Sequence, residues 1–464
     1  MKIINKHLNI FLCIMLIGLL INANSHFNHI RGFFNSEITL FSLINLIRAS
    51  SIVITIFLIV ILNLKEIKIK QNLLISIFYL YIFIQLVSFL FTRKLNLEYD
   101  QFYFLLNQFL IIFFFHITIS LKEISNDKLS LINKIFFYTL IAFIFSVILI
   151  LGKNLYLEYL STGPSSFYYG YFVSPGSIYL NQQVPRITGI ARLILVLVIF
   201  FSITLLYSKL KTSSFIILSF LISMLFLADS RFSIYSFFIL SFILIILDKK
   251  FFLLKKILFF IFIIFFSNLI NISMNALQKN FDDTFDAYQK DLNISNNDTQ
   301  NEKKQLWDKQ LQSAEKKSEK KVKPRFARDF STSGRFKDWS DIIVFVKKKP
   351  IIGYGFQADR YLINRPASNA YLYSLVSGGV IGFVLFAGIV TLSISSCFRV
   401  IFFNKIFQKK SHIIVKSSIL INIMLIIRTI IENSFSIYNF DLIIFLLTYL
   451  IINYYEKNPQ KYSY

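Results

Sequence analysis

The residues most able to do chemistry in this chain are charged side chains that lie within or beside long apolar runs. Arg48 and Arg192 lie inside such runs, and Arg428 and Glu432 lie near the end of another, four residues apart on one helix face. An ionisable side chain in hydrocarbon costs at least ~2.5 kcal/mol, so it faces a partner or a cavity. These positions are therefore candidates for a functional site.

Further arginines lie at the ends of the apolar runs: Arg186, Arg231 in an Asp-Ser-Arg cluster, and Arg335 four residues before Trp339. Arginine binds phosphate oxygens through two parallel hydrogen bonds and keeps its charge when partly desolvated. Several guanidinium groups at one depth suit a polyanionic head group. Simpler alternatives stay open. Arg428 and Glu432 could form only an internal ion pair, and Arg186 and Arg231 could extend to the membrane surface or bind ordinary lipid.

The composition of the chain indicates which kind of helix positions these residues. Of the 464 residues 55% are hydrophobic, above the usual 45–50%, while only 16% are charged, with a net charge of +24. The basic residues lie between apolar runs, which indicates membrane topology and no nucleic-acid partner. About 20 apolar residues cross a bilayer. We expect an all-α, polytopic transmembrane bundle of about twelve spans. The runs are 8–23, 39–64, 73–91, 102–121, 131–151, 187–207, 213–228, 232–247, 251–272, 370–398, 413–431 and 438–455.

Charge also orients the spans. With a cytoplasmic N-terminus, the inner segments contain 21 Lys and Arg and the short outer loops contain 6, as the positive-inside rule requires. Both termini are then cytoplasmic. The chain divides into helices 1–9 at 1–272, a large extracytoplasmic loop at 273–369, and helices 10–12 with the tail at 370–464. We expect the first run to be retained, with a cleaved signal peptide as the alternative.

The large loop has two halves. Residues 299–323 are almost wholly polar, which predicts an exposed helix or disorder. From Arg335 the apolar spacing predicts an amphipathic helix near the membrane that ends before Pro350, and Gly353-Tyr354-Gly355 predicts a turn. Cys13 and Cys397 form no metal motif, and an H-x-x-H at positions 26–29 has no third ligand nearby. We therefore expect no metal and no cofactor.

The order of motifs along the chain resembles that of the bacterial O-antigen ligase/polymerase family, over about 185–450. The motifs are Arg186-Ile-Thr-Gly189, Asp229-Ser230-Arg231, Gly334-Arg335-x-x-x-Trp339, Pro350-x-x-Gly353-Tyr354-Gly355, Ser368-Asn369-Ala-Tyr371-Leu372, Gly378-Gly379-x-x-Gly382 and Arg428-x-x-x-Glu432-Asn433-Ser434. Each motif alone is weak, whereas their order, spacing and side of the membrane together are fairly specific.

The resemblance implies a membrane glycosyltransferase of the bacterial cytoplasmic (inner) membrane, which acts at its outer face on a glycan linked to undecaprenyl diphosphate. We expect Arg231, Arg335 and Glu432 to be catalytic, with Glu432 either accepting a proton or only orienting Arg428. The residues expected to bind substrate are Arg186, Arg192, Arg428, Trp339, Tyr354 and Asn369, with Tyr168 and Tyr169 as further sugar-stacking candidates. Membrane lipid, a chain-length regulator and a flippase are the other partners that this implies.

One position departs from the family pattern. The resemblance implies that ligases of the family use a His just before the Asn of an H-N-x-x-L pattern, and here that position is Ser368. A serine hydroxyl is far too weak a base to replace it at neutral pH. The sequence therefore favours a polymerase of O-antigen or capsule type. An O-antigen ligase, or a flippase or transporter of lipid-linked sugars, is the alternative.

Overall fold

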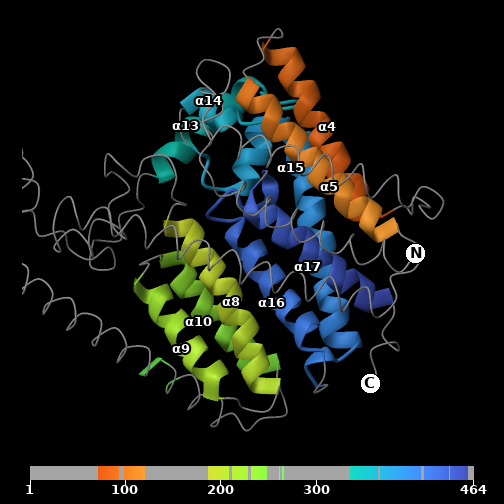
Figure 1. Ribbon diagram of the computed structural model, residues 1–464. Coiled ribbons are helices and arrows are strands. Elements are labelled where there is room, and N and C mark those ends of the chain that lie inside the picture. The colour runs from red at the N-terminus through yellow and green to blue at the C-terminus, as the bar shows by residue number, and fades with distance from the viewer. Residues whose placement is uncertain are drawn as a thin grey trace, which may run out of the picture.

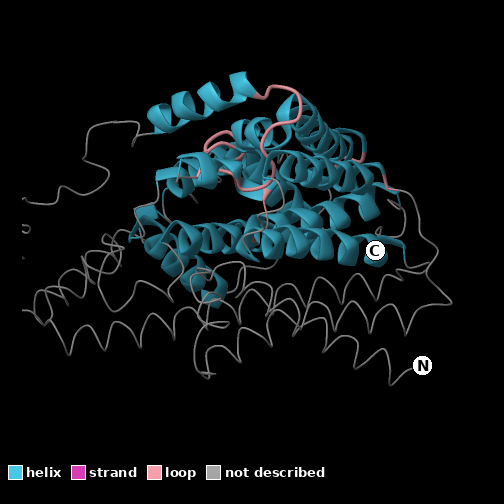
Figure 2. Ribbon diagram, turned by 90° about the horizontal axis from the view of Figure 1, so that it is seen from above, coloured by secondary structure: helices cyan, strands magenta, loops and turns pink. Residues whose placement is uncertain are grey.

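In the computed structural model, the described residues are 72–93, 99–120, 187–207, 212–227, 231–247, 261, 264–265, 335–363, 366–408, 412–437 and 439–457. Every regular element in these ranges is helical, as Figure 2 shows. The α-helices are α4 (Leu73–Arg93), α5 (Tyr99–Ser120), α8 (Ile187–Tyr207), α9 (Thr212–Leu227), α10 (Arg231–Leu247), α13 (Arg335–Lys348), α14 (Ala358–Ile363), α15 (Ala370–Phe398), α16 (Ile413–Arg428) and α17 (Phe440–Lys457). Short π- or 3₁₀-helical turns are η3 (Arg399–Phe403), η4 (Ile406–Gln408) and η5 (Ser434–Ser436).

Eight of these helices coincide with predicted apolar runs, and α13 coincides with the predicted amphipathic helix. Two, Leu73–Thr92 and Ala370–Phe403, are long and apolar enough to cross a membrane, within the described part of the chain. The predicted runs 8–23, 39–64 and 131–151, and nearly all of 251–272, lie outside the described residues.

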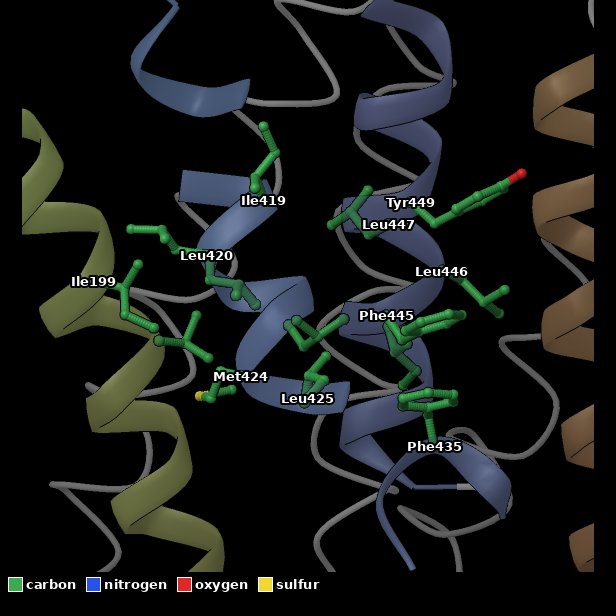
Figure 3. Packing of buried hydrophobic residues seen from close by; sticks show 14 of the residues in the cluster. Ile199, Ile419, Leu420, Met424, Leu425, Phe435, Phe445, Leu446, Leu447 and Tyr449 are labelled. Carbon is green, nitrogen blue, oxygen red and sulfur yellow. The ribbon is translucent and has the colours of Figure 1, made fainter. Parts of the chain in front are cut away.

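The apolar helices pack in two groups joined by α16 (Figure 1). Helices α8, α9 and α10 form one group, and α4, α5, α15 and α17 form the other. Between them, α16 packs on α8 and α10 with one face and on α17 with another. Figure 3 shows this core, where Met424 and Leu425 of α16 lie between Ile199 of α8 and the stacked rings of Phe435 and Phe445, whose centroids are 3.8 Å apart.

Helices α13 and α14 lie together at one end of the bundle, beside the start of α15 (Figure 1). Ile342, Tyr354, Ala358, Tyr373 and Val376 form a small hydrophobic core beneath them. Because α13 contributes few of its side chains to this core, its opposite face is left exposed, with Phe336 and Val344 among the exposed residues.

A break in α15 receives the turn that follows α13. Gly379 has φ +62°, a left-handed conformation that side chains other than glycine rarely adopt. The break frees the carbonyl groups of Val376 and Ser377, which accept hydrogen bonds of 2.8 Å from the N–H groups of Tyr354 and Gly355. On the other side of the segment, the Val380 N–H donates to the Pro350 carbonyl at 2.8 Å.

The same turn is held from behind by α4. The Ser88 hydroxyl donates to the Ile352 carbonyl, and the Phe89 and Phe356 rings stack with centroids 4.5 Å apart. A Cβ added to Gly355 would lie 2.6 Å from the Cα of Phe89, so only glycine fits there. The Gly-Tyr-Gly and Gly-Gly motifs are therefore two halves of one contact between a loop and a broken helix.

Candidate active site

Three arginines and two carboxylates from four helices meet at the end of the bundle that α13 covers. Arg192 of α8 and Arg428 of α16 both contact Oδ2 of Asp441 in α17, at 2.9 and 3.0 Å. Glu432, just after α16, lies 3.3 Å from Arg335 of α13 and 3.8 Å from Arg428. We call these five residues the arginine cluster.

Burial differs across the arginine cluster. Arg428 and Asp441 are 3% and 1% exposed, whereas Arg335 and Glu432 are partly open to solvent. A buried charge is tolerated only when it is paired, and each buried member here has an opposite charge within 3.0 Å. Arg428 and Asp441 therefore hold each other in place, and Arg335 and Glu432 form the side of the arginine cluster that is open to solvent.

The arginine cluster has a surplus of positive charge, three guanidinium groups against two carboxylates. Among the described residues, Asp441 pairs with arginines of α8 and α16, and Glu432 pairs with arginines of α13 and α16. The α10 and α17 N-termini also lie here, because Phe232 and Asp441 are the second residues of those helices. Helix N-termini favour anions. Such a site suits a multiply charged anion such as a diphosphate.

Arg428 makes two further contacts that hold its side chain. Its guanidinium carbon lies 5.1 Å from the centroid of the Phe232 ring at the start of α10. Its Nε lies close to Asp441 but has no aligned hydrogen-bond acceptor among the described residues. Arg428 thus joins both helix groups while retaining an unused donor.

The segment Ser368–Asn369 lies against the end of α16, next to the arginine cluster. The Asn369 side chain donates to the Ile430 carbonyl at 2.8 Å and accepts from Leu372 N–H at 2.9 Å, which caps α15. The Ala370 N–H donates to the Thr429 carbonyl at 2.8 Å. The position that departs from the family pattern, Ser368, is consequently one residue from this junction, and its φ is +50°.

A buried carboxylate, Asp359 of α14, anchors this segment. It is 1% exposed and accepts hydrogen bonds from Ala367 N–H at 2.7 Å and from the Asn433 side-chain amide at 3.3 Å. Burial raises the pKa of the Asp359 carboxyl, while Arg360 and the donated hydrogen bonds oppose that shift. Asp359 therefore ties α14 to the residue that follows Glu432.

Replacing Asp359 with Ala is expected to lower the free energy of unfolding by about 2 kcal/mol or more, because two buried donors lose their acceptor. Thermal unfolding of the purified protein in detergent measures this. Ser340→Ala, which removes only an exposed hydroxyl bonded to Lys337 within α13, is the matched control. Equal unfolding temperatures for the two variants would contradict the anchoring role.

The structure brings Arg192, Arg335, Arg428 and Glu432 together. Arg231 begins α10 and directly precedes Phe232, whose ring contacts Arg428. Trp339 lies one turn beyond Arg335, where its indole N–H donates to the Ala367 carbonyl at 2.9 Å. Tyr354 is placed elsewhere, in the small core under α13, with its hydroxyl on the Phe345 carbonyl at 3.3 Å. Arg48, Arg186, Tyr168 and Tyr169 lie outside the described residues.

Asp441 was missed in the sequence, although it joins two of the expected arginines. The rule that selects Arg428 would also have found it, since it is an acidic residue inside the apolar run 438–455. The burial of Lys416 was also not expected from the sequence. This lysine counts among the cytoplasmic charges by sequence, yet it is fully buried in α16, with Nζ 3.2 Å from the centroid of the Tyr207 ring.

Residues 214–387 match the family model described as O-antigen ligase (Wzy_C), so the chain contains a domain of that family. The match covers nearly all of α9, all of α10, α13 and α14, and α15 as far as position 387, including Arg335 and Asn369. A search of curated proteins found no match. The family consists of O-antigen ligase/polymerase-type membrane enzymes of surface polysaccharide synthesis. The family implies a polytopic membrane protein, and two helices in the described part of the chain are long and apolar enough to cross a membrane.

Proposed function

We propose, from the O-antigen ligase family domain that the chain contains, that it is a polymerase of a bacterial surface polysaccharide. It transfers a growing glycan from undecaprenyl diphosphate to a hydroxyl of a lipid-linked repeat unit, at the outer face of the cytoplasmic membrane. The observation that supports this most is the arginine cluster, which brings three guanidinium groups together at one end of the bundle.

The chemistry needs little covalent assistance, because the donor sugar is already activated. The acceptor hydroxyl oxygen forms a bond to the anomeric carbon of the donor. The bond from that carbon to the diphosphate oxygen breaks, and undecaprenyl diphosphate leaves with the electron pair. Guanidinium groups that are fixed before the reaction stabilise the charge that develops on this leaving group. Arg335 and Arg428 fill that role, with Arg231 and Arg186 as further ligands.

Glu432 takes the proton of the acceptor hydroxyl in this proposal. In the structure its two carboxylate oxygens contact Arg335 and Arg428. A diphosphate that binds these arginines competes with that contact and leaves the carboxylate free to accept the proton. Asp441 stays paired with Arg192 and Arg428 throughout and positions them.

A ligase is the second candidate, favoured by the description of the matching family. The residue Ser368 argues against a ligase, because it lies where ligases of the family have a His. Its hydroxyl donates to the Pro366 carbonyl at 3.4 Å and cannot act as a base at neutral pH. Deleting the gene and separating surface and lipid-linked glycans on a gel decides between the two. Loss of the ladder, with one repeat unit left on its acceptor, supports a polymerase. Polymer that stays on undecaprenyl diphosphate supports a ligase, and repeat units held on the cytoplasmic side indicate a flippase.

Glu432→Gln is expected to slow chain growth by about 100-fold, because the amide retains the shape of the carboxylate but accepts no proton. The measurement is the rate of polymer formation from lipid-linked repeat units by purified protein in liposomes. Glu456→Gln, which alters an ion pair with Arg399 far along α15 and α17, is the matched control. Normal chain growth in Glu432→Gln would exclude Glu432 as the base.

A further inference from the structure

A groove runs between α13 and α14, outside the arginine cluster. It has a volume of about 390 Å³, within the range of small-molecule binding clefts. Its lining combines two charged side chains with an apolar floor: Lys337, Asp341, Val344, Phe345, Leu362 and Ile363. We propose that this groove binds the glycan chain next to the reaction site, an inference that rests on the proposed function.

The charged pair suits a neutral, polyhydroxylated ligand. Lys337 and Asp341 are four residues apart on α13, yet they form no ion pair with each other and bond to no other side chain in the described part of the structure. Lysine supplies only donors and an ionised aspartate only acceptors, and a sugar hydroxyl can satisfy either. Because the two charges cancel, the groove selects neither a phosphate nor a cation.

The floor suits the other side of a sugar. Val344, Phe345, Leu362 and Ile363 present apolar surface against which the C–H face of a pyranose ring can pack. A lipid chain would also match these four residues, but it would leave Lys337 and Asp341 without hydrogen-bond partners. A glycan can contact both the charged and the apolar residues of the lining, so it fits the groove better than a lipid does.

The groove lies close enough to the arginine cluster to hold sugars of the same chain. Arg335 reaches Glu432 from the first turn of α13, and Lys337 reaches the groove from the opposite side of that turn. The separation is therefore about one helix diameter, ~10 Å. On the other side of the groove, Asp359 of α14 accepts a hydrogen bond from Asn433, the residue that follows Glu432. A glycan whose reducing end is at the arginines can extend into the groove.

Binding of a labelled oligosaccharide tests this directly. The probe is a fluorescent fragment of the surface polysaccharide of the same strain, released by mild acid and titrated onto the full-length protein in detergent. Asp341→Asn and Lys337→Gln should each weaken binding by about tenfold, because each removes a charged hydrogen-bonding group. Val344→Trp, which fills the groove from an exposed position, should weaken it similarly. Lys347→Gln, the same charge change at an exposed position of α13 outside the groove, is the control.

In cells, the three groove variants should make polymer with shorter chains, while the first linkage between two repeat units still forms. Equal binding by wild type, control and groove variants, or no binding by the wild type, overturns the inference. The two proposals fail separately. If the groove variants bind normally while Glu432→Gln stalls chain growth, the glycan-binding role of the groove is refuted and the polymerase proposal stands. Weakened binding by the groove variants together with an unchanged glycan profile after gene deletion keeps a sugar site and removes the polymerase.

Discussion

Arg428→Ala should reduce chain growth by about 1,000-fold or more while the protein remains in the membrane. Arg428 is the one member of the arginine cluster that contacts both carboxylates, Glu432 and Asp441. Loss of this side chain removes one guanidinium that stabilises the leaving group. It also removes a contact that holds Glu432 in position. Loss of one such donor alone costs about 100- to 1,000-fold. The rate of polymer formation in liposomes measures the effect.

The truncation also leaves Asp441 buried with Arg192 as its remaining partner in the cluster, so a second variant must separate folding from catalysis. Arg428→Lys keeps the buried charge and should restore the amount of folded protein. It should restore little activity, because an ammonium group cannot bind phosphate through two parallel bonds. Arg399→Ala, an arginine at the other end of α15 paired with Glu456, should leave the rate unchanged. If Arg428→Lys grows chains at the normal rate, Arg428 serves only as an internal ion pair.

Gly379→Ala should destabilise the protein by at least about 3 kcal/mol, from backbone strain and steric overlap together. The φ of +62° at Gly379 is strained for alanine, and the added Cβ would lie 2.1 Å from the Ile351 carbonyl oxygen. The turn at Pro350–Gly355 would have to leave the break in α15, which exposes the carbonyls of Val376 and Ser377. Thermal unfolding in detergent and protease cleavage of the turn in membranes both report this.

Gly388→Ala is the control, because it lies in the same helix without a positive φ. An added Cβ there would meet only Ile77 Cδ1, at 3.9 Å. Alanine is favoured over glycine in a helix by roughly 0.5–1 kcal/mol, so this variant should be neutral or slightly more stable. A Gly379→Ala protein that unfolds at the temperature of Gly388→Ala would show that the break is not required.

The helices were largely predictable because their signal is local. Runs of apolar residues located α4, α5, α8, α15, α16 and α17, and the amphipathic pattern together with Pro350 located α13. The pairing of Arg428 with Glu432 was also local, since residues four apart share a helix face.

The contacts between distant elements were not predictable. Arg192 and Asp441 are 249 residues apart, and nothing in either neighbourhood selects the other. The sequence also treated Tyr354 as a sugar-stacking candidate, and only the placement of its turn shows its ring in the core beneath α13. The role of Gly379 was hidden for the same reason, because two adjacent glycines in a helix do not reveal which will take a positive φ.

The break in α15 also bears on how the chain is assembled during synthesis. An unpaired carbonyl in hydrocarbon costs several kcal/mol, so Val376 and Ser377 need their partners when α15 enters the membrane. Those partners, Tyr354 and Gly355, precede α15 in the chain, as does Ser88 of α4, which holds the turn. Everything that completes the break has therefore left the ribosome before the helix that contains it, and the break need not wait for any segment translated later.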